Sequence, residues 1–226
     1  MKLEDRIEDF ARRAREQTMA LAATSTPALE VLRHRGREAF ASTALPGAKT
    51  ESWKYSRIGP LLEQGLLDRP REDAAIPELP TMAGFGGARI LMLDGRPRRL
   101  PEAQEMPAGV TVTCFSAASG AMAEVLEREL GSLASLDGRP FVALNGALAE
   151  DGVLIHVAPN VQGGELELLL AQSRNAAAHG AQPRVLVVLE AGASLSLAER
   201  HWGAAEVFTN AVIEVRIAAA ARLAHM

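Results

Sequence analysis

Cysteine and long apolar runs are what this sequence has least of. One cysteine occurs in 226 residues, so a single chain can form neither an internal disulfide nor a four-cysteine zinc or cluster site. No apolar stretch approaches the length of about 18 residues that a membrane-spanning helix needs. The first twenty residues carry charges on both sides of every apolar residue, which is not the pattern of a signal peptide. These absences predict a cytoplasmic protein.

Aromatic residues and charge of one sign are scarce as well. Aromatic residues make up 4% of the chain and the net charge is −4, whereas a general nucleic-acid binder would usually be basic. Two groups of arginines alternate with glutamates, so we expect solvated helix faces there and no nucleic-acid site. These arginines are Arg12, Arg13, Arg15, Arg33, Arg35 and Arg37.

The sequence motifs of common enzyme classes are missing too. There is no Gly-x-x-x-x-Gly-Lys phosphate loop, no Gly-x-Ser-x-Gly elbow and no His-Glu-x-x-His zinc motif. We therefore expect that the chain is not an enzyme and hydrolyses no nucleotide itself. Its content of 48% hydrophobic and 23% charged residues is that of an ordinary globular protein with one or two domains.

Residues 1–68 are interpreted as an N-terminal helical region. Apolar residues recur at helical spacing from Leu3 to Leu21 and again from Leu29 to Phe40. Thr26 and Pro27 supply an N-cap and a first-turn proline for the second helix. Leu45-Pro46-Gly47 is expected to end it.

Residues 69–150 are expected to form a linker followed by a mixed α/β segment. The stretch 69–87 is rich in proline, glycine and acidic residues, which is typical of a linker or surface loop. The expected elements after it are strands at 88–93 and 110–115, a hairpin turn at Asp94-Gly95, a helix capped by Ser116 or Ser119 and ended by Gly131, and a short helix through Phe141, Leu144 and Leu148.

Residues 151–226 predict strands joined by short corners. The expected strands are 153–157, 166–170, 185–189, 195–198 and 212–217, with corners at Pro159-Asn160, Gly163-Gly164 and Ala191-Gly192 and a longer excursion at 175–182. Part of this segment repeats 28 positions further on: Val187, Leu189 and Leu195 recur as Val215, Ile217 and Leu223, and the corner 190–193 recurs as 218–221. Periodicity leaves a β-sandwich and a parallel β-helix open, and the repeat favours stacked coils.

Several blocks of the sequence resemble one known family. The blocks are Lys-Thr-Glu-Ser-Trp-Lys-Tyr-Ser at 49–56, Pro-Phe-Val-Ala-Leu-Asn at 140–145, Pro-Arg-Val-Leu-Val at 183–187, Glu-Ala-Gly at 190–192, Glu-Arg-His at 199–201, Phe-Thr-Asn-Ala-Val at 208–212 and Ala-Arg-Leu-Ala-His at 221–225. In this order they resemble the SufB/SufD family of iron–sulfur cluster assembly scaffold proteins, and SufD more than SufB.

The resemblance implies a fold and a role. The fold would be a right-handed parallel β-helix preceded by an N-terminal α-helical region, with 151–226 as the start of the β-helix core. The role would be that of a non-catalytic scaffold that works with a SufB-type sister subunit and a SufC-type ATPase. A nascent iron–sulfur cluster, and a reduced flavin, would belong to that complex and not to this chain alone.

The resemblance covers the N-terminal half of relatives that are roughly twice as long. It implies that the sister-subunit interface, the ATPase-binding helices and the cluster positions have no counterpart here. We therefore expect no catalytic, cofactor-binding or metal-ligating residue in the chain. A β-helix that ends within a coil would expose an unpaired strand edge, which predicts self-association.

The sequence has six cysteine and histidine side chains that could react or bind a metal. Cys114 is expected to be a small buried hydrophobe. The five histidines, His34, His156, His179, His201 and His225, lack the spacing of a helical zinc motif. His201 and His225 share strand parity with Leu195 and Leu223, so both are expected to point into the coil as hydrogen-bonded core histidines.

Two motifs and one alternative function remain open. Glu199-Arg200-His201 is interpreted as a structural corner held by charge-assisted hydrogen bonds. Trp53-Lys54-Tyr55 is interpreted as an anchor of the helical region, with a binding surface as the alternative. The alternative function is a short β-helix enzyme acting on a carbohydrate or acyl substrate, which would need clustered carboxylates or a catalytic histidine along one stacked face.

Overall fold

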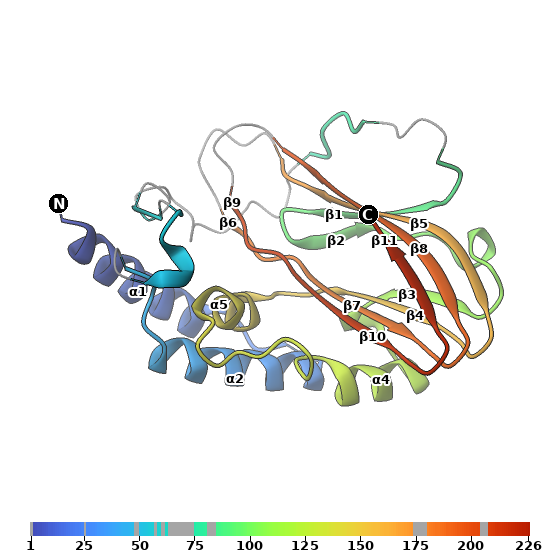
Figure 1. The fold of residues 1–226 in the computed structure, drawn as a ribbon, viewed down its shortest axis with the longest axis horizontal. Helices are drawn as coiled ribbons and strands as arrows, with labels where there is room; N and C mark the ends of the chain where they lie inside the picture. Colours follow the sequence, from blue (N-terminus) through green and yellow to red (C-terminus); the bar gives the residue numbers. More distant parts are fainter. Residues whose placement is uncertain are drawn as a thin grey trace.

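The structure is a computed structural model with helices near the N-terminus and sheets rich in parallel pairing after them (Figure 1). It describes residues 2–24, 26–47, 50–56, 58–59, 62, 75–80, 85–173, 180–203 and 208–226. Helices near the N-terminus and the expected strands are both present among these residues. The expected excursion at 175–182 and His179 fall largely or wholly outside the described residues.

The two helices expected in the first forty residues are confirmed as α1 (Leu3–Ala20) and α2 (Pro27–Ser42). Further helices are α4 (Ala121–Glu129) and α5 (Pro140–Leu148), and short 3-10 helices are η1 (Glu51–Trp53), η2 (Ala103–Glu105) and η3 (Phe115–Ala117). Helices α2 and α5 pack backbone against backbone at Gly36, where an added Cβ would lie 2.4 Å from the Ala147 nitrogen. Only glycine allows that approach.

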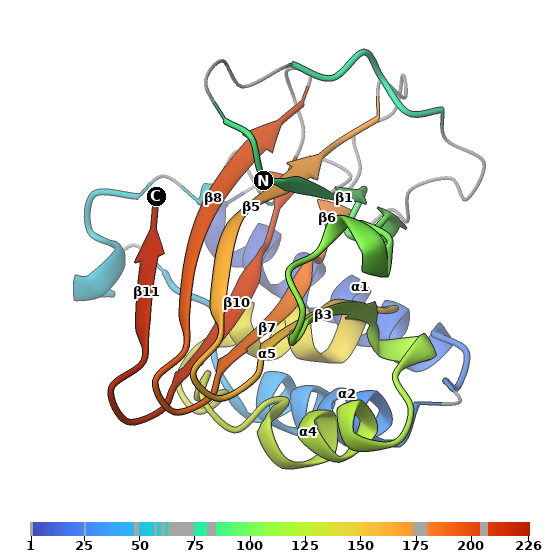
Figure 2. The ribbon, with the colours of Figure 1, turned by 90° about the vertical axis from the view of Figure 1, so that its right-hand side faces the viewer.

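The strands form two larger sheets and one small one (Figures 1 and 2). Sheet A has the order β11-β8-β5-β1-β2, sheet B has β10-β7-β4-β3, and sheet C pairs β6 with β9. The strands are β1 (Ala88–Leu93), β2 (Arg96–Arg99), β3 (Val110–Cys114), β4 (Val153–Val157), β5 (Gln162–Ala171), β6 (Gly180–Ala181), β7 (Arg184–Leu189), β8 (Ser194–Trp202), β9 (Phe208–Thr209), β10 (Val212–Ile217) and β11 (Arg222–His225).

From β4 onward the chain visits the sheets in a repeating order. The strands fall successively in sheets B, A, C, B, A, C, B and A, and every pair formed among them is parallel. The 28-residue repeat lies in register, because Val187 pairs with Val215 and Leu195 pairs with Leu223. Equivalent residues of successive passes therefore lie side by side.

The corners that follow β4, β7 and β10 also stack. Asn160, Gly192 and Ala220 occupy equivalent positions and all have positive φ, at 60°, 71° and 59°. Their backbones are joined, since Asn160 N donates to Ala191 O and Gly192 N donates to Ala219 O, both at 2.9 Å. A Cβ on Gly192 would lie 2.4 Å from the Asn160 side-chain oxygen, so this corner requires glycine for two reasons.

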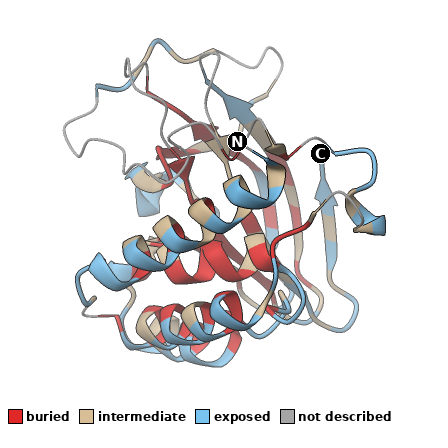
Figure 3. Ribbon diagram, turned by 90° about the vertical axis from the view of Figure 1, so that its left-hand side faces the viewer, coloured by how far each residue is buried: buried red, intermediate tan, exposed pale blue. Residues whose placement is uncertain are grey.

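The two middle strands of sheet B, β4 and β7, are largely buried on both faces (Figure 3). Alternate residues of β4 and β7, such as Ile155 and Val187, face the core between sheets A and B. The intervening residues, such as Leu154 and Leu186, pack with Leu29 of α2 in a second cluster that also includes residues of α4. Continuous apolar strands of this kind are typical of parallel sheets covered on both sides.

One expected cap and one expected corner are wrong. Neither Ser116 nor Ser119 caps α4, whose N-cap residue is Gly120; Ser116 instead donates its hydroxyl to Asp151 Oδ2 at 2.6 Å. Thr26 is the N-cap residue of α2 and Pro27 lies in its first turn, as expected, although the Thr26 side chain makes no capping hydrogen bond. Gly163-Gly164 lies inside β5, where the register with β8 shifts. The hairpin turn at Asp94-Gly95 is confirmed, with φ of 52° and 85°.

One arginine departs from the expected solvated face. Arg33 is buried, and its guanidinium donates to the backbone oxygens of Ala149 at 2.7 Å, Ala22 at 2.9 Å and Glu150 at 3.2 Å. It thus binds carbonyls just past the C-terminus of α5, where a helix favours cations. The alternation of arginine and glutamate in the sequence could not distinguish this tertiary role from a solvated one.

Candidate functional site

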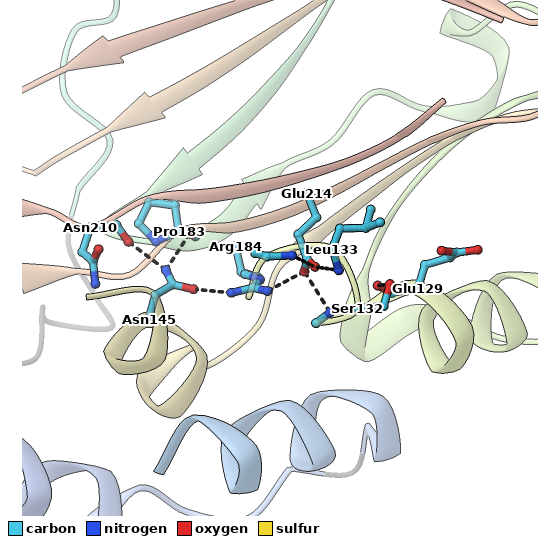
Figure 4. Close-up of polar contacts among 10 residues, drawn as sticks. Glu129, Ser132, Leu133, Asn145, Pro183, Arg184, Asn210 and Glu214 are labelled. Atoms are coloured by element: carbon cyan, nitrogen blue, oxygen red, sulfur yellow. Dashed lines mark hydrogen bonds and ion pairs between the residues drawn. The ribbon is translucent and has the colours of Figure 1, made fainter. Parts of the chain in front are cut away.

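Three of the sequence blocks come together at one buried polar junction (Figure 4). Its members come from separate elements: Asn145 from α5, Arg184 from β7, Glu214 from β10 and Asn210 from the segment between β9 and β10. More than sixty positions separate Asn145 from Glu214 in sequence. The fold therefore brings the blocks 140–145, 183–187 and 208–212 into direct contact.

Asn145 is the centre of one half of this junction. Its side-chain amide donates to Asn210 O at 2.7 Å and to Pro183 O at 2.9 Å, and its Oδ1 accepts from Arg184 Nη1 at 3.1 Å. Both donors and an acceptor of the buried amide are thereby used. The Asn210 side chain in turn donates to Gln182 Oε1 at 2.7 Å.

The ion pair of Arg184 and Glu214 is the centre of the other half. Both side chains are 0% exposed. Besides the guanidinium, the Glu214 carboxylate accepts three backbone N–H groups of the loop after α4, from Gly131 at 2.9 Å and from Leu133 and Ala134 at 3.0 Å. Each of the two carboxylate oxygens therefore accepts hydrogen bonds.

The pKa values of this pair follow from burial and from these contacts. Burial alone would raise the pKa of Glu214, but the Arg184 charge and the backbone N–H groups outweigh it, so the pKa of the carboxyl lies below its ordinary value. Burial lowers the pKa of Arg184, and the Glu214 charge opposes that change. An arginine remains protonated under these conditions, so the junction holds a buried charge pair at neutral pH.

Such a junction is built to hold parts of the fold together and not to react. Its charges are neutralised and shielded from solvent, so no accessible nucleophile or proton donor results. It joins α5, the loop after α4, β7 and β10 into one unit. Sequence reasoning missed Glu214 altogether, because its partners lie in a loop about eighty positions away.

An aromatic row continues this unit towards the N-terminus. Trp53 lies 5.2 Å from Phe141 and Phe141 lies 6.4 Å from Phe208, measured between ring centroids. These three rings belong to three of the sequence blocks. Tyr55 behaves differently: it is 92% exposed and lies beside Lys54, whose Nζ is 5.6 Å from the ring. Trp53 therefore anchors its segment, and Tyr55 does not.

The two histidines expected inside the coil lie at the surface. The side chain of His201 is 53% exposed and that of His225 is 34% exposed, and each hydrogen-bonds one oxygen of Glu199, at 2.8 Å and 2.9 Å. The parity argument placed them on the same face as Leu195, but β11 pairs only with residues 194–197 of β8. Beyond residue 197, Met226 is the last described residue along that edge of β8, and its backbone oxygen accepts from Glu199 N at 2.8 Å.

The remaining candidates have local roles. In the Glu199-Arg200-His201 block, Arg200 donates to Glu167 at 2.8 Å across strands, so the block lies in a strand and not at a corner. His34 is exposed beside Glu38, and His156 lies 3.3 Å from Glu190.

Cys114 ends β3 half-buried instead of fully buried. Burial, together with the Asp151 carboxylate, raises the pKa of its thiol. The reactive thiolate is therefore disfavoured at neutral pH.

The described residues offer neither a clustered metal site nor a membrane-spanning helix. They contain no group of three or more histidine, cysteine, aspartate or glutamate side chains placed to hold a metal ion. None of their helices is both long and apolar enough to cross a membrane.

Comparison with known proteins identifies one segment. No curated protein matches the chain. Residues 88–165 match the family model of the SufBD protein N-terminal region. This segment runs from the start of β1 into β5 and includes α4, α5 and Asn145 of the junction. Over residues 88–165 the chain is therefore similar to the SufBD protein N-terminal region, and the match does not distinguish SufB from SufD.

Proposed function

We propose that the chain is a non-catalytic, SufD-like scaffold subunit of Suf-type iron–sulfur cluster assembly. The observation that carries the proposal is the match of residues 88–165 to the SufBD N-terminal region. The convergence of blocks outside that segment supports it: Arg184 and Asn210 contact Asn145 within it, and Trp53 packs on Phe141. Residues on both sides of the matched segment thus belong to the same structural unit.

The fold proposed with this function is the start of a right-handed parallel β-helix. The recurring order of sheets B, A and C, the parallel pairing and the stacked corners at Asn160, Gly192 and Ala220 support it. In such a stack each pass contacts only its neighbours. We propose the boundaries 1–68 for the helical region, 69–150 for the linker and mixed segment, and 151–226 for the β-helix.

A scaffold needs a rigid frame more than a reactive centre. The buried junction supplies rigidity, because it fixes α5 and the loop after α4 to β7 and β10. The partners proposed are a SufB-type sister subunit and a SufC-type ATPase in the cytoplasm. The nascent cluster and a reduced flavin would be bound by that assembly.

The alternative of a carbohydrate-acting enzyme gains no support from the outer face of sheet A. A shallow pocket of about 380 Å³ there is lined across β5, β8 and β11 by residues that include Gln162, Ser194 and Arg222. Glu165 is its sole carboxylate among the described residues. A glycosidase of the usual kind needs a pair.

Affinity purification of the tagged protein from its own cells tests the proposal. We expect a SufB-type subunit and a SufC-type ATPase to be recovered with it and to remain with it through size-exclusion chromatography with light scattering. Recovery without either subunit, from cells in which both are present and bind each other, would contradict the proposed function.

A further inference from the structure

A second polar site lies at the opposite side of sheet A from the core between the sheets. It is a pocket of about 330 Å³ whose walls include Arg89 from β1, Arg99 from β2 and Glu167 from β5. Phe85 and Leu100 add apolar surface, and Glu105 also lines the pocket. The volume is at the small end of the range for ligand sites, about 300–1,000 Å³.

A buried carboxylate organises the charges of this pocket. Glu167 is 2% exposed, and each of its oxygens accepts from a different guanidinium, from Arg89 Nε at 2.6 Å and from Arg200 Nη1 at 2.8 Å. One carboxylate cannot neutralise two guanidiniums. The set of Arg89, Glu167 and Arg200 therefore carries one excess positive charge, and Glu167 fixes the orientation of Arg89.

Donors remain for a ligand. Arg89 uses Nε for Glu167 and Nη2 for the Pro80 carbonyl at 3.2 Å, which leaves its Nη1 without a partner among the described residues. Arg99 lies opposite Leu91 in the β1–β2 pair. Its side chain has no hydrogen bond or ion pair with any other residue in the described part of the chain.

One group opposes an anion here. Glu105 carries a negative charge, although its Oε2 already accepts the backbone N–H of Glu102 at 2.7 Å. The walls of the pocket carry two guanidiniums, Arg89 and Arg99, and two carboxylates, Glu105 and Glu167. Arg200 does not line the pocket, but its guanidinium binds Glu167, so the cluster as a whole keeps one excess positive charge. Guanidinium groups match the geometry of phosphate and carboxylate oxygens and bind them through paired N–H donors.

We propose that this pocket binds a small oxyanion, the phosphate or carboxylate group of a small molecule, through Arg89 and Arg99. The site is independent of the proposed scaffold function, and it lies on the face of sheet A away from the junction of Arg184 and Glu214. Phe85 and Leu100 would contact the apolar part of such a ligand.

Isothermal titration calorimetry of the full chain, at constant ionic strength, tests the proposal with inorganic phosphate and with malonate as probes. We expect saturable binding of at least one probe, and the one that binds identifies the source of the oxyanion. Arg99→Gln should weaken that binding about tenfold or more, since a hydrogen bond to a charged group is lost. Glu105→Gln should tighten it by up to about fivefold, because an exposed repulsion of this kind is small.

Arg98→Gln is the matched control, because Arg98 adjoins Arg99 in β2 but does not line the pocket. It removes the same charge and should leave the affinity within about twofold of the unmodified chain. Circular dichroism of each variant checks that it is folded. Absence of saturable binding of both probes in the millimolar range would overturn the proposal, as would equal weakening by Arg98→Gln and Arg99→Gln.

Discussion

Replacing Glu214 by glutamine is the sharpest test of the buried junction. In the structure one carboxylate oxygen faces Arg184 and the Gly131 N–H, and the other faces the N–H groups of Leu133 and Ala134. A glutamine amide has one oxygen and one NH₂ group. Whichever way it is rotated, its NH₂ group meets other donors.

The expected cost follows from these contacts. Glu214→Gln removes the negative charge and leaves the Arg184 guanidinium, at 0% exposure, without a counter-charge. Breaking a buried ion pair on one side costs about 3–5 kcal/mol. The Asn145 bond to Arg184 persists, so we expect a loss of about 4 kcal/mol in the free energy of unfolding, which is a large part of the stability of an ordinary domain.

Urea unfolding followed by circular dichroism measures this loss. Glu38→Gln, at an exposed position of α2, is the matched control and should change the unfolding free energy by about 0.5 kcal/mol or less. Adding Arg184→Met to Glu214→Gln removes the uncompensated charge, so the double variant should be more stable than Glu214→Gln alone. A loss below about 1 kcal/mol for Glu214→Gln, or strict additivity in the double variant, would refute the reasoning.

Three further outcomes follow from the same contacts. Folding lowers the pKa of Glu214. The ionised carboxylate therefore contributes to stability above the unfolded pKa of about 4.3, and this contribution is lost as the pH falls through the folded pKa. Urea midpoints should fall more steeply between neutral and acid pH for the unmodified chain than for Glu214→Gln, and equal slopes would contradict this prediction. Gly36→Ala places a Cβ 2.4 Å from the Ala147 nitrogen and should lower the unfolding free energy by about 1–3 kcal/mol. The control Gly47→Ala, whose Cβ would have no atom within 4 Å, should change the unfolding free energy little. Similar thermal midpoints for the two variants would refute the close packing of α2 and α5. Ala220→Gly relieves an alanine at φ 59° and should raise the unfolding free energy by about 0.5–1 kcal/mol, and a lower thermal midpoint would exclude that conformation.

Local sequence patterns predicted the bounds of helices and strands well where a single local signal, such as an apolar run between turn residues, determined them. The strands at 88–93, 153–157 and 212–217 have the expected bounds, because apolar β-prone runs were flanked by clear turn residues. The repeat of Val187 at Val215 correctly indicated neighbouring strands. The two-residue strands β6 and β9 were not predicted, since two residues are too short for any periodicity.

The buried junction could be predicted only in part. The blocks containing Asn145, Arg184 and Asn210 were recognised in the sequence, but their contact depends on chain segments far apart and on the fold. Glu214 and Arg33 look like ordinary charged residues in sequence, and both are buried by tertiary contacts. His201 shows the opposite error, because strand parity says which face a residue occupies but not whether that face is covered.

The central claim is that the chain serves cluster assembly as part of a scaffold and holds no cluster by itself. The iron content of the purified chain tests this claim most directly. The chain alone would be incubated anaerobically with ferrous iron and sulfide, desalted, and analysed for bound iron and for visible absorption. We expect no iron to remain after desalting. Stoichiometric iron retained by the chain alone would contradict the account.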